Sequence, residues 1–271
     1  MIALKTNEWN ESYARKENYI FYPHEEVVRF LSRYIRRRVG SDKKFIDIIY
    51  KGDTYQSGIG IVNTKGESIS SDFGGGGEMS HLKALDFGCG IGRQSILMDE
   101  FGIEAHGIDI AKNALQEANA LAKKLESNAT FSLYNGKEIP YSNAFFDFCI
   151  SYGVLDSLPF ALAKELVKEI DRVTKTYFFL SLIGSESISS FASQKEGRDF
   201  NGEIEVQEAH EKGTIQSFFD RDKIYTLFES TNFVIKNLEL ITHTNLMTNV
   251  ANTRYYIVAQ KAHDETSKNP H

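Results

Sequence analysis

The stretch that decides the fold of this chain is Ala84-Leu85-Asp86-Phe87-Gly88-Cys89-Gly90-Ile91-Gly92-Arg93. An apolar segment that predicts a strand leads into three glycines at alternate positions, and a segment that predicts a helix follows. Glycine has no Cβ, so such a loop can turn tightly and a ligand can approach its backbone. The first turn of the helix offers free N–H groups and the positive end of the helix dipole. The stretch therefore predicts a ligand-binding loop between a strand and a helix.

Strand and helix patterns alternate along the chain on the C-terminal side of this loop. The predicted strands are residues 83–87, 104–108, 130–133, 145–151, 176–182, 233–241 and 254–260. The predicted helices are residues 91–101, 111–125, 160–173 and one that Asp220 caps. Such alternation is typical of a parallel sheet with helices on both faces. The predicted fold class is therefore α/β, with ligands bound at the carboxyl ends of the strands.

Residues 1–80 are predicted to form an N-terminal helical cap and a linker that precede the main domain. Pro23 is expected to begin a helix that Gly40 ends. The basic face of this helix is either solvated or a phosphate-binding surface, because guanidinium groups pair with phosphate. That face carries Arg29, Arg33, Arg36 and Arg37. Two short strands are predicted at residues 45–50 and 59–62, with a turn between them at residues 51–53. A glycine-rich linker is predicted at residues 70–77.

The composition is that of an ordinary soluble globular protein, with 41% hydrophobic and 25% charged residues. A net charge of −6 disfavours nonspecific binding to nucleic acid or to an anionic membrane. No apolar run approaches the roughly 18–20 residues that a membrane helix needs, and the N-terminus does not resemble a signal peptide. Cys89 and Cys149 lie in apolar or glycine-rich segments, so neither a disulfide nor a metal site is expected. We therefore expect a cytoplasmic monomer or homodimer that acts on a small molecule.

The spacing of the glycines distinguishes two classes of nucleotide site. Dinucleotide-binding loops have the pattern G-x-G-x-x-G. Here the pattern is G-x-G-x-G, from Gly88 to Gly92, with the acidic Asp86 two residues before the first glycine. This resembles motif I of the class I S-adenosylmethionine (SAM)-dependent methyltransferases. The resemblance implies that SAM is the cofactor and that residues 81–262 form a Rossmann-like, mostly parallel seven-stranded sheet whose last strand is antiparallel.

Three further segments follow the order and spacing of the same family. Asp109 ends a predicted strand, where a carboxylate accepts hydrogen bonds from ribose hydroxyls, although a NAD site has an acid there too. Asn135 stands where many members have an adenine-contacting aspartate, and Tyr152 follows the strand beside the transferred methyl. The resemblance implies cofactor contacts by Asp86, Gly88, Cys89, Gly90, Gly92, Asp109, Ile110, Asn135, Gly136, Ser151 and Tyr152.

The acceptor is expected to bind to the insertion at residues 184–217, a long segment with weak periodicity. Residues 202–219 and Arg254-Tyr255-Tyr256 resemble segments of bacterial methyltransferases of surface-polysaccharide biosynthesis. This second resemblance implies an acceptor such as a sugar, a sugar nucleotide or a phosphoamine, for example phosphoethanolamine, methylated on oxygen or nitrogen. The polar residues 263–271 are predicted to be a disordered tail.

The candidates for catalysis and acceptor binding lie outside the cofactor segments. His210 is the leading base or substrate ligand, because imidazole titrates near neutral pH. The other candidate catalytic residues are Tyr22, Tyr152 and Asp156. The candidate substrate-binding residues are Tyr19, Arg33, His210, Gln216 and Arg254. Alternatives to this function are a NAD-linked oxidoreductase, a non-catalytic SAM-binding protein and a methyltransferase acting on nucleic acid or protein.

Overall fold

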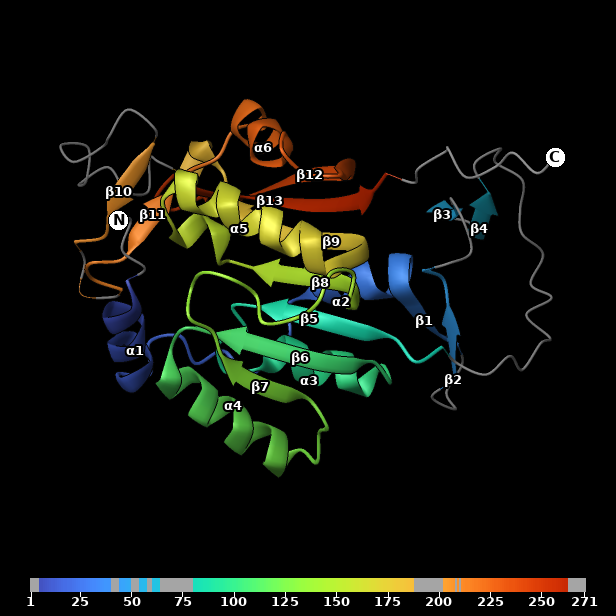
Figure 1. The fold of residues 1–271 in the computed structure, drawn as a ribbon. Helices are drawn as coiled ribbons and strands as arrows, with labels where there is room; N and C mark the ends of the chain where they lie inside the picture. Colours follow the sequence, from blue (N-terminus) through green and yellow to red (C-terminus); the bar gives the residue numbers. More distant parts are fainter. Residues whose placement is uncertain are drawn as a thin grey trace.

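The computed structural model describes residues 5–39, 44–49, 54–57, 60–63, 80–187, 202–207, 209 and 211–262. A seven-stranded sheet with the order β12-β13-β9-β8-β5-β6-β7 forms its centre (Figure 1). The strands are β5 (Lys83–Phe87), β6 (Glu104–Asp109), β7 (Thr130–Leu133), β8 (Phe146–Tyr152), β9 (Thr174–Ile183), β12 (Phe233–Asn245) and β13 (Val250–Lys261). β5 to β9 pair in parallel, and β13 is antiparallel to both of its neighbours. The predicted fold class is confirmed.

Helices cover both faces of the sheet, as an α/β alternation requires. They are α2 (Glu25–Phe30), α3 (Arg93–Glu100), α4 (Lys112–Lys124), α5 (Phe160–Val173) and α6 (Arg221–Phe228). Alternate residues of β8 pack into two separate hydrophobic cores. Cys149 packs with α5 and α6, whereas Phe148 and Ile150 pack with α2 and α3. Burial on both faces explains why β8 is almost entirely apolar. Among the helices that the structure describes, none has the length and apolarity to cross a membrane.

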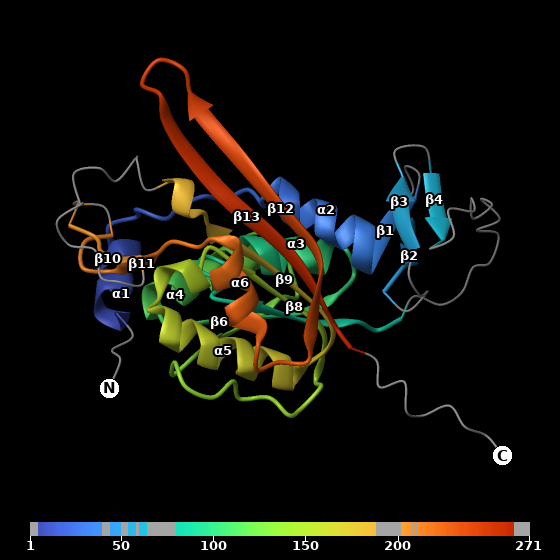
Figure 2. The ribbon, with the colours of Figure 1, turned by 90° about the horizontal axis from the view of Figure 1, so that it is seen from above.

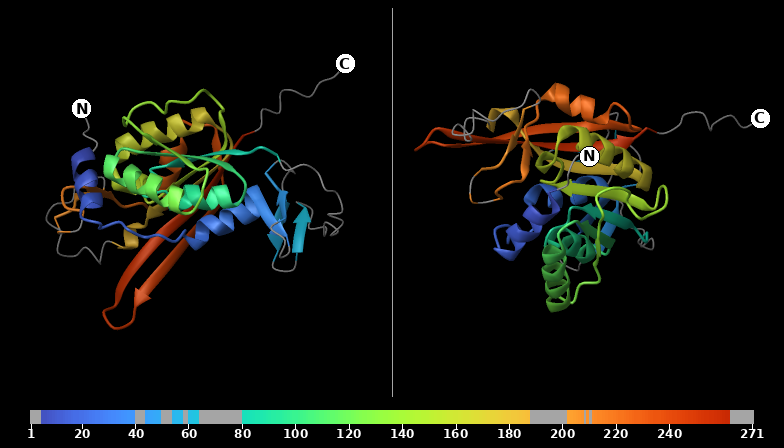
Figure 3. Two further views of the ribbon diagram at one scale, coloured as in Figure 1. Left: turned by 90° about the horizontal axis from the view of Figure 1, so that it is seen from below. Right: turned by 60° about the vertical axis from the view of Figure 1, so that its left-hand side comes forward.

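The sequence did not predict the first helix, α1 (Thr6–Ala14). It lies against α4, as the right-hand view of Figure 3 shows. Two hydrogen bonds fix this contact: Asn113 N donates to Asn10 Oδ1 over 2.9 Å, and Asn113 Nδ2 donates to the Asn10 carbonyl over 3.0 Å. Because α4 follows β6, this docking carries α1 to the edge of the sheet where the glycine loop lies.

The helix expected from Pro23 to Gly40 is shorter than predicted. After α2 it continues as one π-helical turn, η1 (Leu31–Ile35), and the chain then forms β1 (Arg36–Val39), which pairs with β2 (Lys44–Asp47). Arg36 is fully buried, not solvated. It pairs with Asp47 and donates to three backbone carbonyls, those of Phe101, Gly102 and Ser80. A guanidinium with this many partners is stable inside the protein, so the prediction of one exposed basic face was wrong.

Three hairpins complete the described chain. β3 (Thr54–Ser57) pairs with β4 (Gly60–Asn63), which matches the strand predicted at 59–62. The predicted turn at 51–53 and the linker at 70–77 lie outside the described residues. In the insertion, β10 (Glu203–Glu205) pairs with β11 (Ile215–Ser217). β12 and β13 are longer than predicted and project beyond the sheet (Figure 2), since β13 pairs with β9 only from Arg254 to Gln260.

Candidate active site

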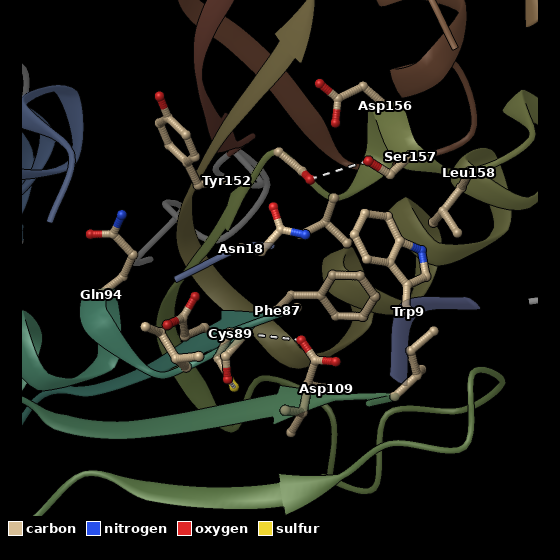
Figure 4. Close-up of a pocket in the computed structure, with 18 of the residues that line it drawn as sticks. Trp9, Asn18, Phe87, Cys89, Gln94, Asp109, Tyr152, Asp156, Ser157 and Leu158 are labelled. Atoms are coloured by element: carbon tan, nitrogen blue, oxygen red, sulfur yellow. Dashed lines mark hydrogen bonds between the residues drawn. The ribbon is translucent and has the colours of Figure 1, made fainter. Parts of the chain in front are cut away.

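A cavity of about 290 Å³ opens at the carboxyl ends of β5, β6 and β8. Its donor end, the part next to the glycine loop, includes Asp86, Gly90 and Asp109. Its acceptor end, the part beyond β8, includes Asp156, Gln216 and Arg254. Figure 4 shows Asp109 and Asp156 on opposite sides of the cavity, with Asn18 and Phe87 between them. This is the edge at which a doubly wound sheet binds ligands.

The glycine loop needs its glycines for two reasons. Gly88, Gly90 and Gly92 have positive φ angles of 72°, 54° and 82°, a region that favours glycine. A Cβ on Gly88 would lie 2.4 Å from a Val154 methyl, and one on Gly92 would lie 2.6 Å from the ring of Phe131. Gly92 therefore supports packing under the loop, whereas Gly88 and Gly90 line the cavity.

Two buried carboxylates hold the loop to its strands. Asp86 Oδ2 accepts a hydrogen bond from Ser95 Oγ over 2.6 Å, which joins β5 to α3. Asp109 accepts from the backbone N–H groups of Gly90 and Ala111, each over 2.8 Å. Burial raises the pKa of Asp86 to about 6 and also raises the pKa of Asp109. Both side chains line the cavity, so they shape the loop and face a ligand at the same time.

A chain of polar contacts that begins at α3 supports one wall of the cavity, which Arg93 and Tyr152 line. Burial, with the nearby charges of Arg93 and Arg254, lowers the pKa of His24 to about 3, so its imidazole is neutral. Arg93 Nη2 can therefore donate to His24 Nε2 over 2.8 Å. The His24 ring stacks on Tyr152 with 3.6 Å between centroids, and the Tyr152 hydroxyl lies 3.4 Å from that of Tyr256. This chain fixes the Tyr152 ring against the cavity.

The acceptor end is a cluster that the fold assembles from distant segments. Asp156 lies in the short 3-10 helix η2 (Leu155–Ser157) and is 1% exposed. Its Oδ2 atom accepts from Arg254 Nη1 over 3.0 Å and from Ile183 N over 2.9 Å. Gln216 Nε2 donates to the Asp156 carbonyl over 2.8 Å. Burial raises the pKa of Asp156, although the Arg254 guanidinium opposes that shift.

Helix α1 covers the cavity, and two of its aromatic residues line it. Trp9 and Tyr13 lie one helical turn apart, and Tyr13 Oη would be 2.5 Å from a Cβ placed on Gly90. Lys5, the residue immediately before α1, donates from Nζ to Glu205 Oε2 of β10 over 3.4 Å, so the start of α1 is tied to the insertion. Neither aromatic residue was predicted to be part of the site. Their i, i+4 spacing was the available signal, because it places two large side chains on one face of a helix.

The structure brings ten of the predicted site residues to this cavity and leaves others away from it. The residues that line it are Asp86, Gly88, Cys89, Gly90, Asp109, Ile110, Tyr152, Asp156, Gln216 and Arg254. Tyr22 is 82% exposed and Arg33 is exposed. Tyr19 contacts Glu117, and loss of hydration together with this contact raises the pKa of Tyr19 to about 12. Asn135 is exposed and its Oδ1 accepts from Lys137 N, while Ser151 is buried behind the cavity wall. The other residues off the cavity lining are Gly92 and Gly136. His210 lies outside the described residues.

Comparison with solved structures finds the same fold. A SAM-dependent methyltransferase from Methanosarcina mazei is 23% identical, with a TM-score of 0.58 over 68% of this chain and 93% of that one. A protein from Pyrococcus horikoshii OT3 is 19% identical, with a TM-score of 0.55 over 68% and 83%. Magnesium protoporphyrin IX methyltransferase from Synechocystis PCC 6803, with bound SAH, is 15% identical, with a TM-score of 0.52 over 68% and 76%. A comparison with curated proteins gave no match.

The fold and the loop together define a class I SAM-dependent methyltransferase. The model of the family described as "Methyltransferase domain" matches residues 78–232, which is more than half of the chain. The chain belongs to this family. The predictions of a methyltransferase and of SAM as its methyl donor are confirmed.

Proposed function

We propose that this enzyme transfers the methyl group of SAM to an oxygen or nitrogen atom of a small polar molecule. The candidate acceptors are a sugar, a sugar nucleotide or a phosphoamine such as phosphoethanolamine, as in surface-glycan biosynthesis. The observation that carries the proposal is one cavity that joins the glycine loop to the buried polar cluster of Asp156, Gln216 and Arg254. A methyl donor and a polar acceptor can therefore meet without leaving the cavity.

The residues at the donor end fit SAM. We assign the methionine part to the backbone of Gly88 to Gly90, the ribose to Asp109, and the neighbouring adenine to Ile110. Gln94 supports this assignment: it is 3% exposed, lines the cavity, and neither of its amide atoms has a hydrogen-bond partner among the described residues. An unpaired buried amide costs about 1–3 kcal/mol, so a ligand that pairs with it is favoured. SAM, when bound, supplies a methyl group on a positively charged sulfur.

The protein itself aligns the two bound molecules and excludes water from them. Tyr152, the last residue of β8, lines the same cavity as the donor loop and the acceptor cluster that contains Asp156. Helix α1 and the β10–β11 hairpin cover this region, and Lys5 contacts Glu205 between them. Aligning two bound molecules and excluding water are the main requirements for transfer from an already reactive donor. A covered cavity of about 290 Å³ also favours a small acceptor over nucleic acid or protein.

The test is a transfer assay with SAM labelled on its methyl group. Sugars, sugar nucleotides and phosphoethanolamine are offered separately, with RNA and a protein mixture as comparison acceptors. We expect label in one of the small-molecule classes and none in the macromolecules. Calorimetry with SAM and with NAD(H) runs in parallel. Saturable binding of NAD(H) with none of SAM would overturn the proposed function before any acceptor is considered.

A further inference from the structure

The carboxylate of Asp156 has one oxygen that nothing in the described structure satisfies. Oδ2 accepts from Arg254 Nη1 and from Ile183 N, over 3.0 and 2.9 Å. Oδ1 is buried and has no hydrogen-bond partner among the described residues. The residue lines the cavity. A buried acceptor atom without a partner is costly, so this atom marks a place where a ligand's N–H or O–H group would bind.

Gln216 adds a second acceptor beside the first. It is 7% exposed, and its Nε2 donates to the carbonyls of Asp156 and Ser217 over 2.8 and 3.3 Å. Carbonyl oxygens only accept, so these contacts fix which amide atom is nitrogen. Both N–H bonds of Gln216 are therefore used within the protein, and its Oε1 is the polar atom left for the cavity. The contact with the Asp156 backbone places the two side chains next to each other.

The charge of this cluster is already balanced. Asp156 and Arg254 form an ion pair, with Nη1 and Oδ2 3.0 Å apart, so together they carry no net charge. An ammonium or phosphate group placed beside them would bring an uncompensated charge into a buried site, which is strongly unfavourable. Hydroxyl groups can donate to the two free oxygens without adding charge. The cluster therefore favours neutral donors over ions.

We propose that the acceptor end binds two neighbouring hydroxyl groups of an uncharged sugar ring, and that Asp156 accepts the proton of the hydroxyl that is methylated. This rests on the proposed function and selects sugar rings, free or nucleotide-linked, over phosphoamines. The hydroxyl oxygen forms a bond to the methyl carbon while the methyl–sulfur bond breaks, and that bond's electron pair stays on sulfur. The hydroxyl proton passes to Asp156 Oδ1 and then to solvent.

The first experiment measures binding to the protein saturated with S-adenosylhomocysteine (SAH), the demethylated product of SAM. The probes are methyl pyranosides of several ring configurations, their monodeoxy analogues, ethanolamine and phosphoethanolamine. We expect at least one pyranoside to bind and a deoxy analogue to bind about 10-fold more weakly, as loss of one buried hydrogen bond predicts. Binding of phosphoethanolamine or ethanolamine, with every pyranoside failing, would overturn the proposal, and so would failure of the whole panel. Failure of SAH itself to bind would instead count against the proposed function.

The second experiment tests the two side chains. In Asp156→Asn the amide oxygen stays with Arg254 and Ile183 N, which both donate, so an N–H group faces the cavity and cannot take a proton. We expect at least about 100-fold slower turnover with SAH affinity unchanged. Asp171→Asn is the matched control, since Asp171 is buried, pairs with Lys261 over 3.4 Å and lies away from the cavity. Equal loss of turnover in both variants would refute the role of Asp156.

Gln216→Leu gives an independent check if Asp156→Asn does not fold. The variant should weaken the binding of the intact pyranoside by about 10-fold. For the deoxy analogue that lacks the hydroxyl bound by Gln216, the variant and the wild-type protein should have the same affinity. Fully additive losses between the variant and the analogue would show that the two groups do not meet.

Discussion

The donor end and the acceptor end of the cavity are built in different ways. The donor end comes from one continuous segment, from Asp86 to Ile110, whose loop is held by hydrogen bonds to Asp109 and Ser95. The acceptor end joins η2, β11 and β13, and its two main contacts span 60 and 98 residues of sequence. A short local pattern can therefore specify the donor, whereas the acceptor depends on how distant segments pack. The same donor end could serve many different acceptor ends without a change of fold.

The largest effect is expected at the donor end, for Gly90→Val. Gly90 has a φ of 54°, and a Cβ there would lie 2.5 Å from Tyr13 Oη. A branched side chain would strain the loop and enter the space where the ligand approaches its backbone. We expect SAM affinity to fall by about 100-fold or more, as measured by calorimetry, with the global fold retained by circular dichroism.

The control for Gly90→Val is Gly102→Ala. Gly102 also has a positive φ, 68°, but it follows α3 and does not line the cavity. Its replacement should cost about 1 kcal/mol of stability and leave SAM affinity unchanged. If Gly90→Val bound SAM normally, the loop would not be the donor site, and the division of the cavity into two ends would be wrong.

The donor end has two buried carboxylates with raised pKa values, Asp86 and Asp109, and the acceptor end has one, Asp156. Asp86 accepts from the neutral Ser95 hydroxyl, and Asp156 pairs with the charged Arg254. The pKa of Asp86 is about 6 in the folded protein, against an ordinary 3.8. Its contribution to stability is therefore present at low pH and is lost as pH rises through about 6, because the folded protein binds that proton more tightly.

Asp86→Asn should remove this dependence on pH. Its amide can still accept from Ser95, and it never ionises. Relative to the wild type, the variant should gain on the order of 2–3 kcal/mol between pH 4 and pH 7.5. Denaturant unfolding of both proteins at the two pH values measures this difference. A stability difference that is equal at both values would show that Asp86 ionises normally in the folded protein.

The sequence predicted the local parts of the molecule well. The helix expected at 160–173 is α5, with the same bounds, because its apolar residues fall on one face. Asp220 caps α6 by accepting from Lys223 N over 2.8 Å. The failures of the sequence-based predictions also have a physical cause. Residue type alone predicts a solvated Arg36, since the carbonyls and the carboxylate that bury it lie 11 to 66 residues away.

The site could be predicted only where one segment determines it. The glycines, Asp86 and Asp109 were accessible from spacing, because loop and strand follow each other directly. The cover formed by α1 was not, since its sequence is polar and its docking depends on Asn113, 103 residues further on. The contact between Asp156 and Gln216 was not predictable either. It requires the insertion to fold back on η2, which no local pattern encodes.

The smallest effect is expected where α1 connects the two ends. Asn10→Ala removes the hydrogen bond of 2.9 Å from Asn113 N to Asn10 Oδ1, which contributes about 0.5–1.5 kcal/mol to local docking. The second bond, from Asn113 Nδ2 to the Asn10 carbonyl, stays because it uses the backbone. Trp9 and Tyr13 would then cover the cavity less of the time. We expect the KM for SAM to rise about 3- to 10-fold, while the melting temperature changes little because α1 lies at the periphery.

Asn119→Ala is the matched control for this weaker effect. Asn119 is on the same helix, α4, and donates one hydrogen bond to the Leu115 carbonyl over 2.7 Å, within α4 itself. The control should leave the KM for SAM unchanged, so that a rise in Asn10→Ala reports α1 alone. If both variants raised the KM equally, α4 would act through its own stability. If neither variant raised the KM for SAM, the docking of α1 would not contribute to SAM binding.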